Sequence, residues 1–407
     1  MTMGVMNTSN ITTDLANKSF ASMITRLMPN GNAPLFGLTA MLPTETASQI
    51  EHGFFTKTMI FPEMHLDGAI ADATTNTFTV DSTTHILPGM IMRVNSTFEN
   101  VLIDQVISAT QVKVTRGVGT VAAAAIADDI YLYQVGNAFE ESSLRPNANN
   151  IYPVRITNLT QIFRNTWALS ESTRSTMVIA GETNVAESRQ DCAAFHASDI
   201  EKNIFFGQKY QGTRNGQPFR TMAGFEATVS DLTLYPSSYS AANVTTAGAT
   251  TNYTQLETAL DPMFNQTTDP KGSNDRLLFV GGTARVVLNN IGRLNGTYQM
   301  MDGQTSYGLQ FSTFKLARGT VRLIEHPLFN TNSTWSKMAV AVDLATFRLA
   351  YLGGRKTQNK EFNMSGNQAN DNGIDAVGGT LTTECTVVIK NPPANAVIYN
   401  LTAGAAG

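Results

Sequence analysis

Histidine side chains supply many of the metal ligands and proton-transfer groups of proteins, so their positions are a first guide to chemistry. The five histidines of this chain form neither an H-E-x-x-H motif nor a closely spaced His/Cys set, so no metal site is predicted. One of them falls within a predicted helix, beside its apolar stripe, and is expected to be a packed or surface histidine. The histidines are His52, His65, His85, His196 (the helical one) and His326.

The chain has two cysteines, Cys192 and Cys385, which are separated by almost half of the sequence. Two such distant cysteines make neither a disulfide framework nor a set of zinc ligands. Both have apolar neighbours in the sequence, which predicts buried and unreactive thiols.

Three short patterns resemble binding or catalytic motifs, and each lacks a residue that the chemistry needs. In the loop at 363–379, a calcium-loop frame with Gly373 at position six puts Gly379 where a bidentate acid is required. The turn at 281–283 lacks the lysine or third glycine of phosphate-binding loops. Ser306 is not in the G-x-S-x-G register of a nucleophile elbow. The remaining residues of these patterns are Asn370, Asp371, Asn372 and Asp375 in the loop, and Gly281, Gly282 and Thr283 in the turn.

Paired carboxylates would be needed for hydrolysis of a glycosidic bond. The acidic pairs Glu140-Glu141 and Asp128-Asp129 are adjacent in the sequence, so on a strand they point to opposite faces and cannot act on one bond. They are expected to be solvated or to form ion pairs. No catalytic, cofactor-binding or metal-binding residue and no cofactor is therefore predicted, and the chain is not expected to be an enzyme.

Composition excludes several classes of protein. Of the 407 residues, 42% are hydrophobic, which excludes a disordered chain, and the net charge of -4 excludes a dedicated nucleic-acid binder. Only 15% are charged, whereas 52 are Thr and 34 are Asn. The N-terminus lacks a secretory-signal pattern, and no stretch approaches 18 apolar residues, so neither export nor a membrane partner is expected.

The elements that would position any site fall into a distinctive order. Residues 1–55 are rich in Asn, Thr and Ser and predict an extended arm that lies on another surface. Alternating apolar residues and turn signals predict a small all-β barrel or sandwich at about 68–136, inserted between extended segments. Apolar residues recur every three or four positions over 184–206, which predicts a 23-residue helix with the charged residues, including Glu201, mostly off the apolar stripe. The stripe consists of Ala186, Arg189, Ala193, Ala197, Ile200 and Ile204.

The second half of the chain predicts a mixed α/β region followed by closing strands. Thr254 and Glu257 have the spacing of a capping box for a helix that would run to about Gln266. A short buried strand at 276–280 and a helix at 283–291 follow. Strands are then predicted on either side of 318–320, at 338–352 and at 380–389, with one more apolar run at 392–401.

This order resembles the major capsid proteins of tailed bacteriophages, which have the Hong Kong 97-type fold. The residues 152–164 (YPVRITNLTQIFR) are similar to the strand that returns from the E-loop, the extended β-excursion of that fold, in one subfamily. Similar patterns are Asp199-Ile200-Glu201-Lys202 near the helix end, Val387 to Pro392, and the exit from the insert at 136–140. That subfamily carries a β-barrel insertion near the E-loop.

The resemblance implies an α+β fold in five parts. They are an N-terminal arm at 1–55; an E-loop region at 56–163 with the barrel at about 68–136; a peripheral P-domain at 164–218 with the spine helix 184–206; an axial A-domain at 219–337; and closing P-domain strands with the tail at 338–407. It also implies a virion protein that self-assembles as hexamers and pentamers into an icosahedral or elongated shell around double-stranded DNA, without sequence-specific binding.

Further partners are implied by the resemblance alone. They are a scaffolding protein, a portal at one vertex and decoration proteins, with assembly in the host bacterial cytoplasm. Two other functions remain open from the residues: a tail-tube or fibre subunit, which would share the Thr/Asn-rich composition, and a carbohydrate-active enzyme, which would need carboxylates about 5–10 Å apart.

Overall fold

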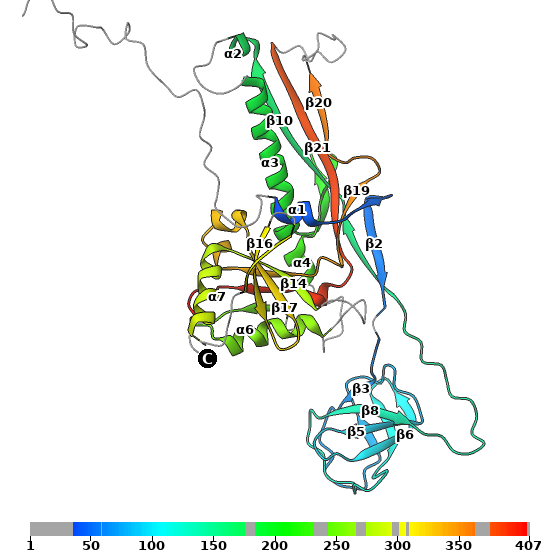
Figure 1. Cartoon of the computed structure of the whole chain (residues 1–407). Helices are drawn as coiled ribbons and strands as arrows, with labels where there is room; N and C mark the ends of the chain where they lie inside the picture. The colour runs from blue at the N-terminus through cyan, green and yellow to red at the C-terminus, as the bar shows by residue number, and fades with distance from the viewer. Residues whose placement is uncertain are drawn as a thin grey trace, which may run out of the picture. The chain divides into compact units, whose positions relative to one another are not determined.

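The structure is a computed structural model that describes residues 36–57, 59–175, 184–230, 243–265, 274–294, 301–306, 309–362 and 375–404. The chain divides into two compact units, one of Phe55–Arg155 and one that combines Met1–Phe54 with Ile156–Gly407. Figure 1 shows the elements of both units. Among the described residues, no helix combines the length and hydrophobicity needed to cross a membrane.

The unit Phe55–Arg155 contains a small antiparallel barrel, which confirms the predicted β-structure. Six strands pair in the order β3-β8-β5-β6-β7-β4, and a bridge between Leu66 and Val80 joins the two ends of the sheet. Inward-facing side chains of the strands, such as Phe78 and Met92, fill the interior. The strands are β3 (Glu63–His65), β4 (Thr77–Thr79), β5 (Met90–Val94), β6 (Asn100–Ser108), β7 (Gln111–Thr115) and β8 (Tyr131–Asn137).

The barrel begins before the predicted range of 68–136, because β3 pairs with β8. Replacing residues 63–137 by a short Gly/Ser linker should therefore leave a soluble, folded protein. Replacing only 68–136 should give aggregates, because Met64 and Leu66, both buried, would lose the barrel interior. Expression of both variants, followed by size-exclusion chromatography and circular dichroism, compares them. Aggregation of both variants would show that the barrel is needed for the larger unit to fold.

The larger unit is built on two sheets. The first has the strand order β1-β19-β21-β10, and β20 also pairs with the long β21. Helix α3 (Asn184–Phe206) lies along β10 and β21 (Figure 1). The strands are β1 (Thr44–Ala47), β10 (Gln161–Ser170), β19 (Phe347–Leu352), β20 (Gln358–Phe362) and β21 (Ala376–Ile389), with α2 (Glu171–Ser175) after β10.

The second sheet has seven strands in the order β13-β22-β18-β14-β17-β16-β15. The boundary predicted at 337 divides this sheet, because β18 and β22 from the region 338–407 lie within it, β18 directly beside β14. Its strands are β13 (Val244–Thr246), β14 (Asp275–Val280), β15 (Met301–Ser306), β16 (Leu309–Lys315), β17 (Thr320–Glu325), β18 (Ala339–Val342) and β22 (Ala396–Tyr399). Its helices include α6 (Tyr253–Leu260) and α7 (Gly282–Leu294).

Smaller elements complete the larger unit. Helix α4 (Phe225–Ser230) packs near the end of α3, and β11 (Tyr210–Arg214) pairs with β12 (Gln217–Thr221) in a hairpin. The strand β2 (Glu51–Thr56) pairs with β9 (Val154–Leu159). Short 3-10 helices lie at Asp261–Phe264, Pro327–Thr331, Trp335–Lys337 and Pro392–Ala394.

The capping box of α6 lies two residues before the predicted one. The side chain of Asn252 accepts a hydrogen bond from the backbone N–H of Gln255 at 2.8 Å, and the Gln255 side chain accepts from the Asn252 N–H at 3.1 Å. The helix ends at Leu260 rather than near 266, because Pro262 lies in the first turn of a following 3-10 helix. Asn252 and Gln255 form the same pair of hydrogen bonds that was predicted for Thr254 and Glu257.

The N-terminal segment is partly embedded in its own chain. Residues 1–35 lie outside the described part, but α1 (Gly37–Met41) buries Leu38, and Leu42 follows it into the same core as the end of α3. The strand β1 then pairs in parallel with β19. The prediction that the arm at 1–55 lies only on another surface is therefore wrong for 36–47.

Candidate assembly surface

The histidines lie in separate environments. Among the described residues, no three His, Cys, Asp or Glu side chains are grouped so as to hold a metal ion. His65 Nδ1 lies 2.6 Å from Asp81, and this hydrogen bond, stronger here than the opposing effect of burial, raises the pKa of His65. The other partners are Glu45 for His52, Asn149 for His85, Asn165 and Thr383 for His196, and Glu201 for His326.

The spine helix has the predicted bounds, but its buried face differs from the predicted stripe. Cys192 and His196 are buried, whereas Ala186 and Ala193 are exposed. Burial lowers the pKa of His196, which favours the neutral ring, and both ring nitrogens lie 2.7 Å from hydrogen-bonding side chains. His196 is therefore a core residue whose two ring nitrogens both have hydrogen-bond partners. Of the two predicted alternatives, a packed or a surface histidine, His196 is the packed one.

Both cysteines are buried, as predicted. Burial raises the pKa of the Cys192 thiol and raises that of Cys385 to about 12. A thiol that stays protonated is a poor nucleophile, so both residues act as small apolar side chains.

The remaining motif-like residues have structural partners or lie outside the described part. The turn between β14 and α7 is closed by Asn330, whose side chain accepts from the Gly282 N–H at 2.6 Å, and a side chain at Gly281 would collide with Ser336. The Gly282 N–H therefore already has a hydrogen-bond partner within the chain and is not free to bind a phosphate. Asp128 accepts from the Gly68 N–H at 2.6 Å. Residues 363–374, with most of the calcium-like loop, and the side chain of Ser306 are not described.

A buried carboxylate, Glu201, connects three parts of the larger unit. Its oxygens accept hydrogen bonds from the Leu38 N–H at 2.7 Å, the Thr39 N–H at 2.8 Å and the Thr39 hydroxyl, all at the start of α1. His326 Nε2 lies 3.0 Å away, and its Nδ1 accepts from the Leu328 N–H, which assigns the ring proton to Nε2. The prediction that Glu201 lies off the buried stripe is wrong.

Glu201 can be buried because every polar partner is provided at once. The α1 helix has no capping side chain of its own, so Glu201 takes that role from another element. The signal was available in the sequence, because Glu201 lies between Ile200 and Ile204 and precedes two phenylalanines at the buried end of the helix. The end of the spine helix thus fixes the base of the N-terminal segment, and Figure 1 shows α1 beside it.

A second buried carboxylate, Glu384, holds β21 to its neighbours. It accepts from the Thr160 hydroxyl at 2.9 Å, and Arg355 Nη1 lies 2.8 Å from its other oxygen. Arg220, on the β11–β12 hairpin, lies 3.6 Å away. Two cations for one carboxylate neutralise the buried charge, so this group is structural rather than catalytic.

The barrel has its own buried ion pair, between Glu99 and Arg116. The arginine donates to both carboxylate oxygens at 2.7 Å, and Glu99 also accepts from the Gly117 N–H at 2.9 Å. Burial alone would raise the pKa of Glu99, but these hydrogen bonds and the Arg116 charge outweigh it and lower the pKa. The pair therefore stabilises the ionised form of Glu99 within the barrel.

The thermal stability of the barrel should therefore fall in acid. A carboxyl whose pKa is lower in the folded state stabilises the fold above its unfolded pKa, and this contribution is lost as the pH falls through the folded value. The midpoint of barrel unfolding should drop as the pH is lowered below the ordinary glutamate value of 4.5. Glu99→Gln should be less stable at pH 7 and depend less on pH in this range. An equally steep pH dependence in the variant would assign the effect to other carboxylates.

Exposed apolar side chains gather in the two segments that flank the barrel in the sequence, at 55–62 and 139–155. Phe55, Met59 and Phe61 are 67–71% exposed, and Tyr152 is 79% exposed. Single exposed apolar residues are ordinary, but several large ones in two short segments indicate a surface that another molecule covers. Leu144, Val154 and Phe139 belong to the same set. We call these seven residues the flanking apolar set.

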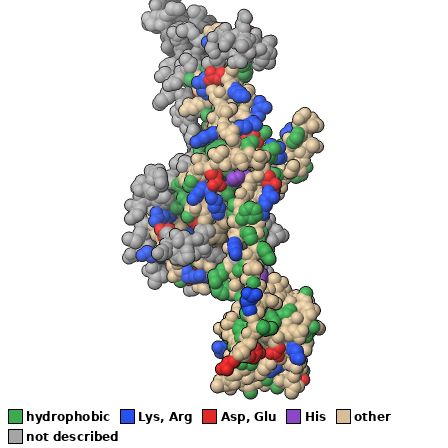
Figure 2. Space-filling model, turned by 90° about the vertical axis from the view of Figure 1, so that its right-hand side faces the viewer, with side chains coloured by type: hydrophobic (Ala, Val, Ile, Leu, Met, Phe, Trp, Pro, Cys, Tyr) green, Lys and Arg blue, Asp and Glu red, His purple; other side chains and the backbone are tan. Residues whose placement is uncertain are grey.

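Charge is unevenly shared between the two units. Phe55–Arg155 contains ten acidic residues and six Lys or Arg, and so carries the whole formal charge of -4, whereas the larger unit is neutral. Figure 2 shows a group of Asp and Glu side chains on the surface of the barrel, with Lys and Arg side chains beside them. Neither unit has the excess of positive charge that tight DNA binding requires.

Comparisons with known proteins identify the family of this chain. A family model described as SU10 major capsid protein matches residues 7–402. The major capsid protein of Pseudomonas phage PaMx41 is 36% identical over 407 residues, which cover 98% of this chain and 96% of that protein. Both matches are to major capsid proteins rather than to tail-tube or fibre subunits.

Solved structures align with this chain at low sequence identity. The Mycobacterium phage Adephagia structure covers 99% of both chains with 9% identity and a TM-score of 0.48. The SrpI encapsulin of Synechococcus elongatus covers 98% of this chain and 97% of its own, with 9% identity and a TM-score of 0.47. The family match and the 36% identical relative, which both span nearly the whole sequence, show that the chain belongs to the SU10 major capsid protein family and forms the capsid shell of a phage.

Proposed function

We propose that this chain assembles as pentamers and hexamers into a closed icosahedral or elongated head that encloses double-stranded DNA without sequence-specific contacts. The flanking apolar set supports the proposal most directly, because its side chains are exposed in the single chain and buried apolar area drives association. The near-neutral charge fits a shell that surrounds DNA without gripping it.

The same proposal assigns a role to each part of the chain. The segments around the barrel form the E-loop, which covers a neighbouring copy. Helix α3 and the first sheet form the P-domain, and the seven-stranded sheet with α6 and α7 forms the A-domain. A separate scaffolding protein, a portal at one vertex and decoration proteins are proposed as partners, with assembly in the host bacterial cytoplasm.

Electron microscopy of the purified recombinant chain, with light scattering for mass, tests the proposal. Closed shells, or rings of five and six copies, are the expected products. Fibres, or a monomer that stays monomeric after addition of host-cell extract containing the other head proteins, would contradict it.

Substitutions in the flanking apolar set should block assembly without unfolding the subunit. Burial of a phenylalanine contributes about 1.5–3 kcal/mol, so Phe55→Ser with Phe61→Ser should raise the subunit concentration at half-assembly at least about tenfold. Circular dichroism should be unchanged, because both side chains are exposed in the subunit. Val121→Ser, an exposed apolar residue of the same unit outside the set, is the matched control. Normal assembly of the double variant would show that the set is not an interface.

A further inference from the structure

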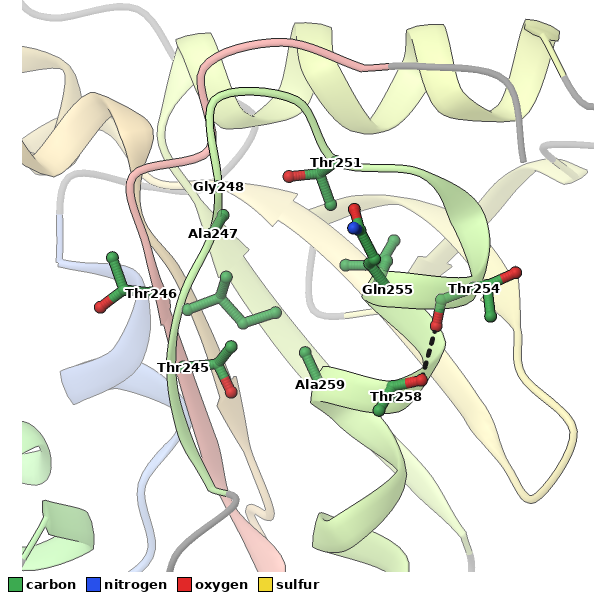
Figure 3. Close-up of a pocket in the computed structure, with 11 residues that line it drawn as sticks. Thr245, Thr246, Ala247, Gly248, Thr251, Thr254, Gln255, Thr258 and Ala259 are labelled. Carbon is green, nitrogen blue, oxygen red and sulfur yellow. Dashed lines mark hydrogen bonds between the residues drawn. The ribbon is translucent and has the colours of Figure 1, made fainter.

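Groups that change charge near neutral pH are unevenly placed in this chain. Figure 3 shows a pocket of about 410 Å³ in the larger unit, between helix α6 and the loop after β13, and none of the eleven residues that line it is ionisable. The pocket therefore offers no group that could respond to pH. In the barrel, by contrast, one histidine and two aspartates meet at the place where the sheet closes.

The barrel closes along a short seam between β3 and β4, the two end strands of its sheet. The bridge across this seam consists of two backbone hydrogen bonds. The Asp81 N–H donates to the His65 carbonyl at 3.0 Å, and the Asp67 N–H donates to the Thr79 carbonyl, also at 3.0 Å. With so short a ladder, side chains that cross the seam contribute a large share of its closure.

The His65 side chain crosses this seam. Its Nδ1 lies 2.6 Å from the Asp81 carboxylate, and its Nε2 lies 3.1 Å from the backbone carbonyl oxygen of Asp129, in the turn before β8. A carboxylate and a carbonyl only accept hydrogen bonds, so both ring nitrogens must donate. Only the protonated ring, the imidazolium, carries a proton on each nitrogen. The geometry therefore requires a charged histidine.

The groups that face the ring favour the same form. The hydrogen bond to Asp81 contributes most to the raised pKa of His65, and the charges of Asp81 and Asp129 act in the same direction, whereas burial opposes them. The Asp129 carboxylate lies 3.9 Å from Nε2. The ring of Tyr131, on β8, packs against the imidazole with 4.3 Å between centroids. The histidine side chain is 25% exposed, so protons reach it from solvent.

The other acidic groups at this place act elsewhere. Asp128, in the same turn as Asp129, accepts from the Gly68 N–H at 2.6 Å and from the Asp129 N–H at 2.9 Å. Glu63, on the same strand as His65, acts on Tyr133. The two carboxylates that influence the histidine are therefore those of Asp81 and Asp129.

The other four histidines have partners that a neutral ring satisfies. His326 Nδ1 accepts from the Leu328 N–H, and the Thr383 hydroxyl can donate to His196 Nε2. Among the described residues, His52 and His85 each have a single acceptor side chain, which one ring N–H satisfies. His65 thus differs from them in needing two ring protons.

We propose that His65 is a pH-dependent latch of the barrel, which holds the seam closed while the ring is protonated and loosens it when the ring loses a proton. After that loss, one ring nitrogen presents a lone pair to an acceptor, and the contact becomes repulsive. Asp129 has a backbone φ of 60°, a conformation that residues other than glycine seldom adopt, so loss of its contact also releases this turn. The latch belongs to the single subunit and does not depend on how copies assemble.

The latch gives the seam a pH dependence of defined sign. A group whose pKa is higher in the folded state stabilises the fold fully below its unfolded value, here 6.5, and this contribution is lost as the pH rises through the folded value. Hydrogen-exchange protection of the seam should therefore fall as His65 loses its proton. The expected fall is about twofold to fivefold, the range for an ion pair near the surface.

Two measurements on the unassembled subunit test the latch from about pH 5 to 9. Nuclear magnetic resonance of histidine-labelled protein gives the titration midpoint of His65, which should lie above 6.5. Hydrogen-exchange mass spectrometry, corrected for the intrinsic pH dependence of exchange, gives the protection of peptides that contain Asp67 and Asp81. The two midpoints should coincide.

Three variants assign the effect. His65→Gln should abolish the fall in protection. Asp81→Asn keeps an acceptor oxygen but removes the charge, so it should move the midpoints of the ring and the seam to lower pH together. His52→Gln, in the larger unit, is the matched control and should leave the seam unchanged.

Any of three results would overturn the proposal. A midpoint of His65 below 6.5 would show that the ring is neutral where the latch requires its charge. Protection that stays constant while His65 titrates would show that the ring does not hold the seam. The same fall in His65→Gln would assign it to another group. If His65→Gln does not fold, a seam midpoint that Asp81→Asn leaves in place contradicts the latch in the same way.

Discussion

Replacing Ile204 by aspartate should unfold the larger unit. Ile204 is fully buried at the end of α3, in the core that joins α1, α3, α4 and both sheets. The substitution removes about 1.5–3 kcal/mol of apolar burial and places a carboxylate in an apolar core, at a cost of several kcal/mol more. A typical domain is stable by only about 5–15 kcal/mol, so little folded protein should remain.

Soluble expression, circular dichroism and urea denaturation measure this effect. Ile200→Asp should behave similarly, because Ile200 is also buried on the same face. Phe195→Asp is the matched control on the same helix, since Phe195 is 67% exposed and its replacement should leave the fold intact. A soluble Ile204→Asp protein with a cooperative urea transition would show that the buried face of α3 has been misassigned.

The parts of the fold that could be predicted are those governed by local pattern. The helix at 184–206 contains no Gly or Pro and is followed by Gly207, and its bounds follow from that, although its buried face differs from the predicted stripe. The barrel strand β5 alternates, and its residues Met90, Met92 and Val94 fill the interior. The strand β14 is short, apolar and bounded by a Gly-Gly turn.

The errors arose where distant residues decide the structure. β18 and β22 belong to a sheet whose other strands come from a different part of the sequence, and no local pattern specifies strand order. His196 is a core residue only because Asn165 and Thr383 meet it there. Leu38 has a core to enter only because α3 ends beside it. Sequence spacing does not contain these long-range pairings.

The candidate surface illustrates the same limit. The barrel and its flanking segments could be located from the sequence, but not which of their apolar side chains stay exposed. Met64 and Met59 are equally apolar and five positions apart, yet Met64 fills the barrel and Met59 faces solvent. The difference comes from the pairing of β3 with β8, which turns Met64 inward.

Replacing Glu201 by glutamine should have the second largest effect on stability. The variant keeps the shape of the side chain but exchanges one acceptor oxygen for an N–H₂ group. One oxygen of Glu201 accepts from the Leu38 N–H and His326, and the other accepts from the two donors of Thr39. The N–H₂ group would face a donor at either position, so at least one donor loses its partner. Loss of a charged hydrogen bond together with an unsatisfied donor costs roughly 3–5 kcal/mol.

Urea denaturation of the unassembled subunit measures the loss, with Glu187→Gln, a partly exposed position near the start of the same helix, as the control. A double-mutant cycle with His326→Phe should give a coupling energy above about 1 kcal/mol, because the two side chains share one hydrogen bond.

Limited proteolysis provides a readout specific to the N-terminal segment. Glu201 supplies the cap that α1 lacks, so the variant should be cleaved within 36–47 under conditions in which the wild type is protected. Cleavage there would show that the segment has been released from the core. A subunit in this state exposes Leu38 and Leu42 to solvent, so the loss of stability would also affect the arm that is used in assembly. Equal urea midpoints and equal protection in the variant and the wild type would show that packing of those two leucines, rather than the carboxylate, holds the segment in place.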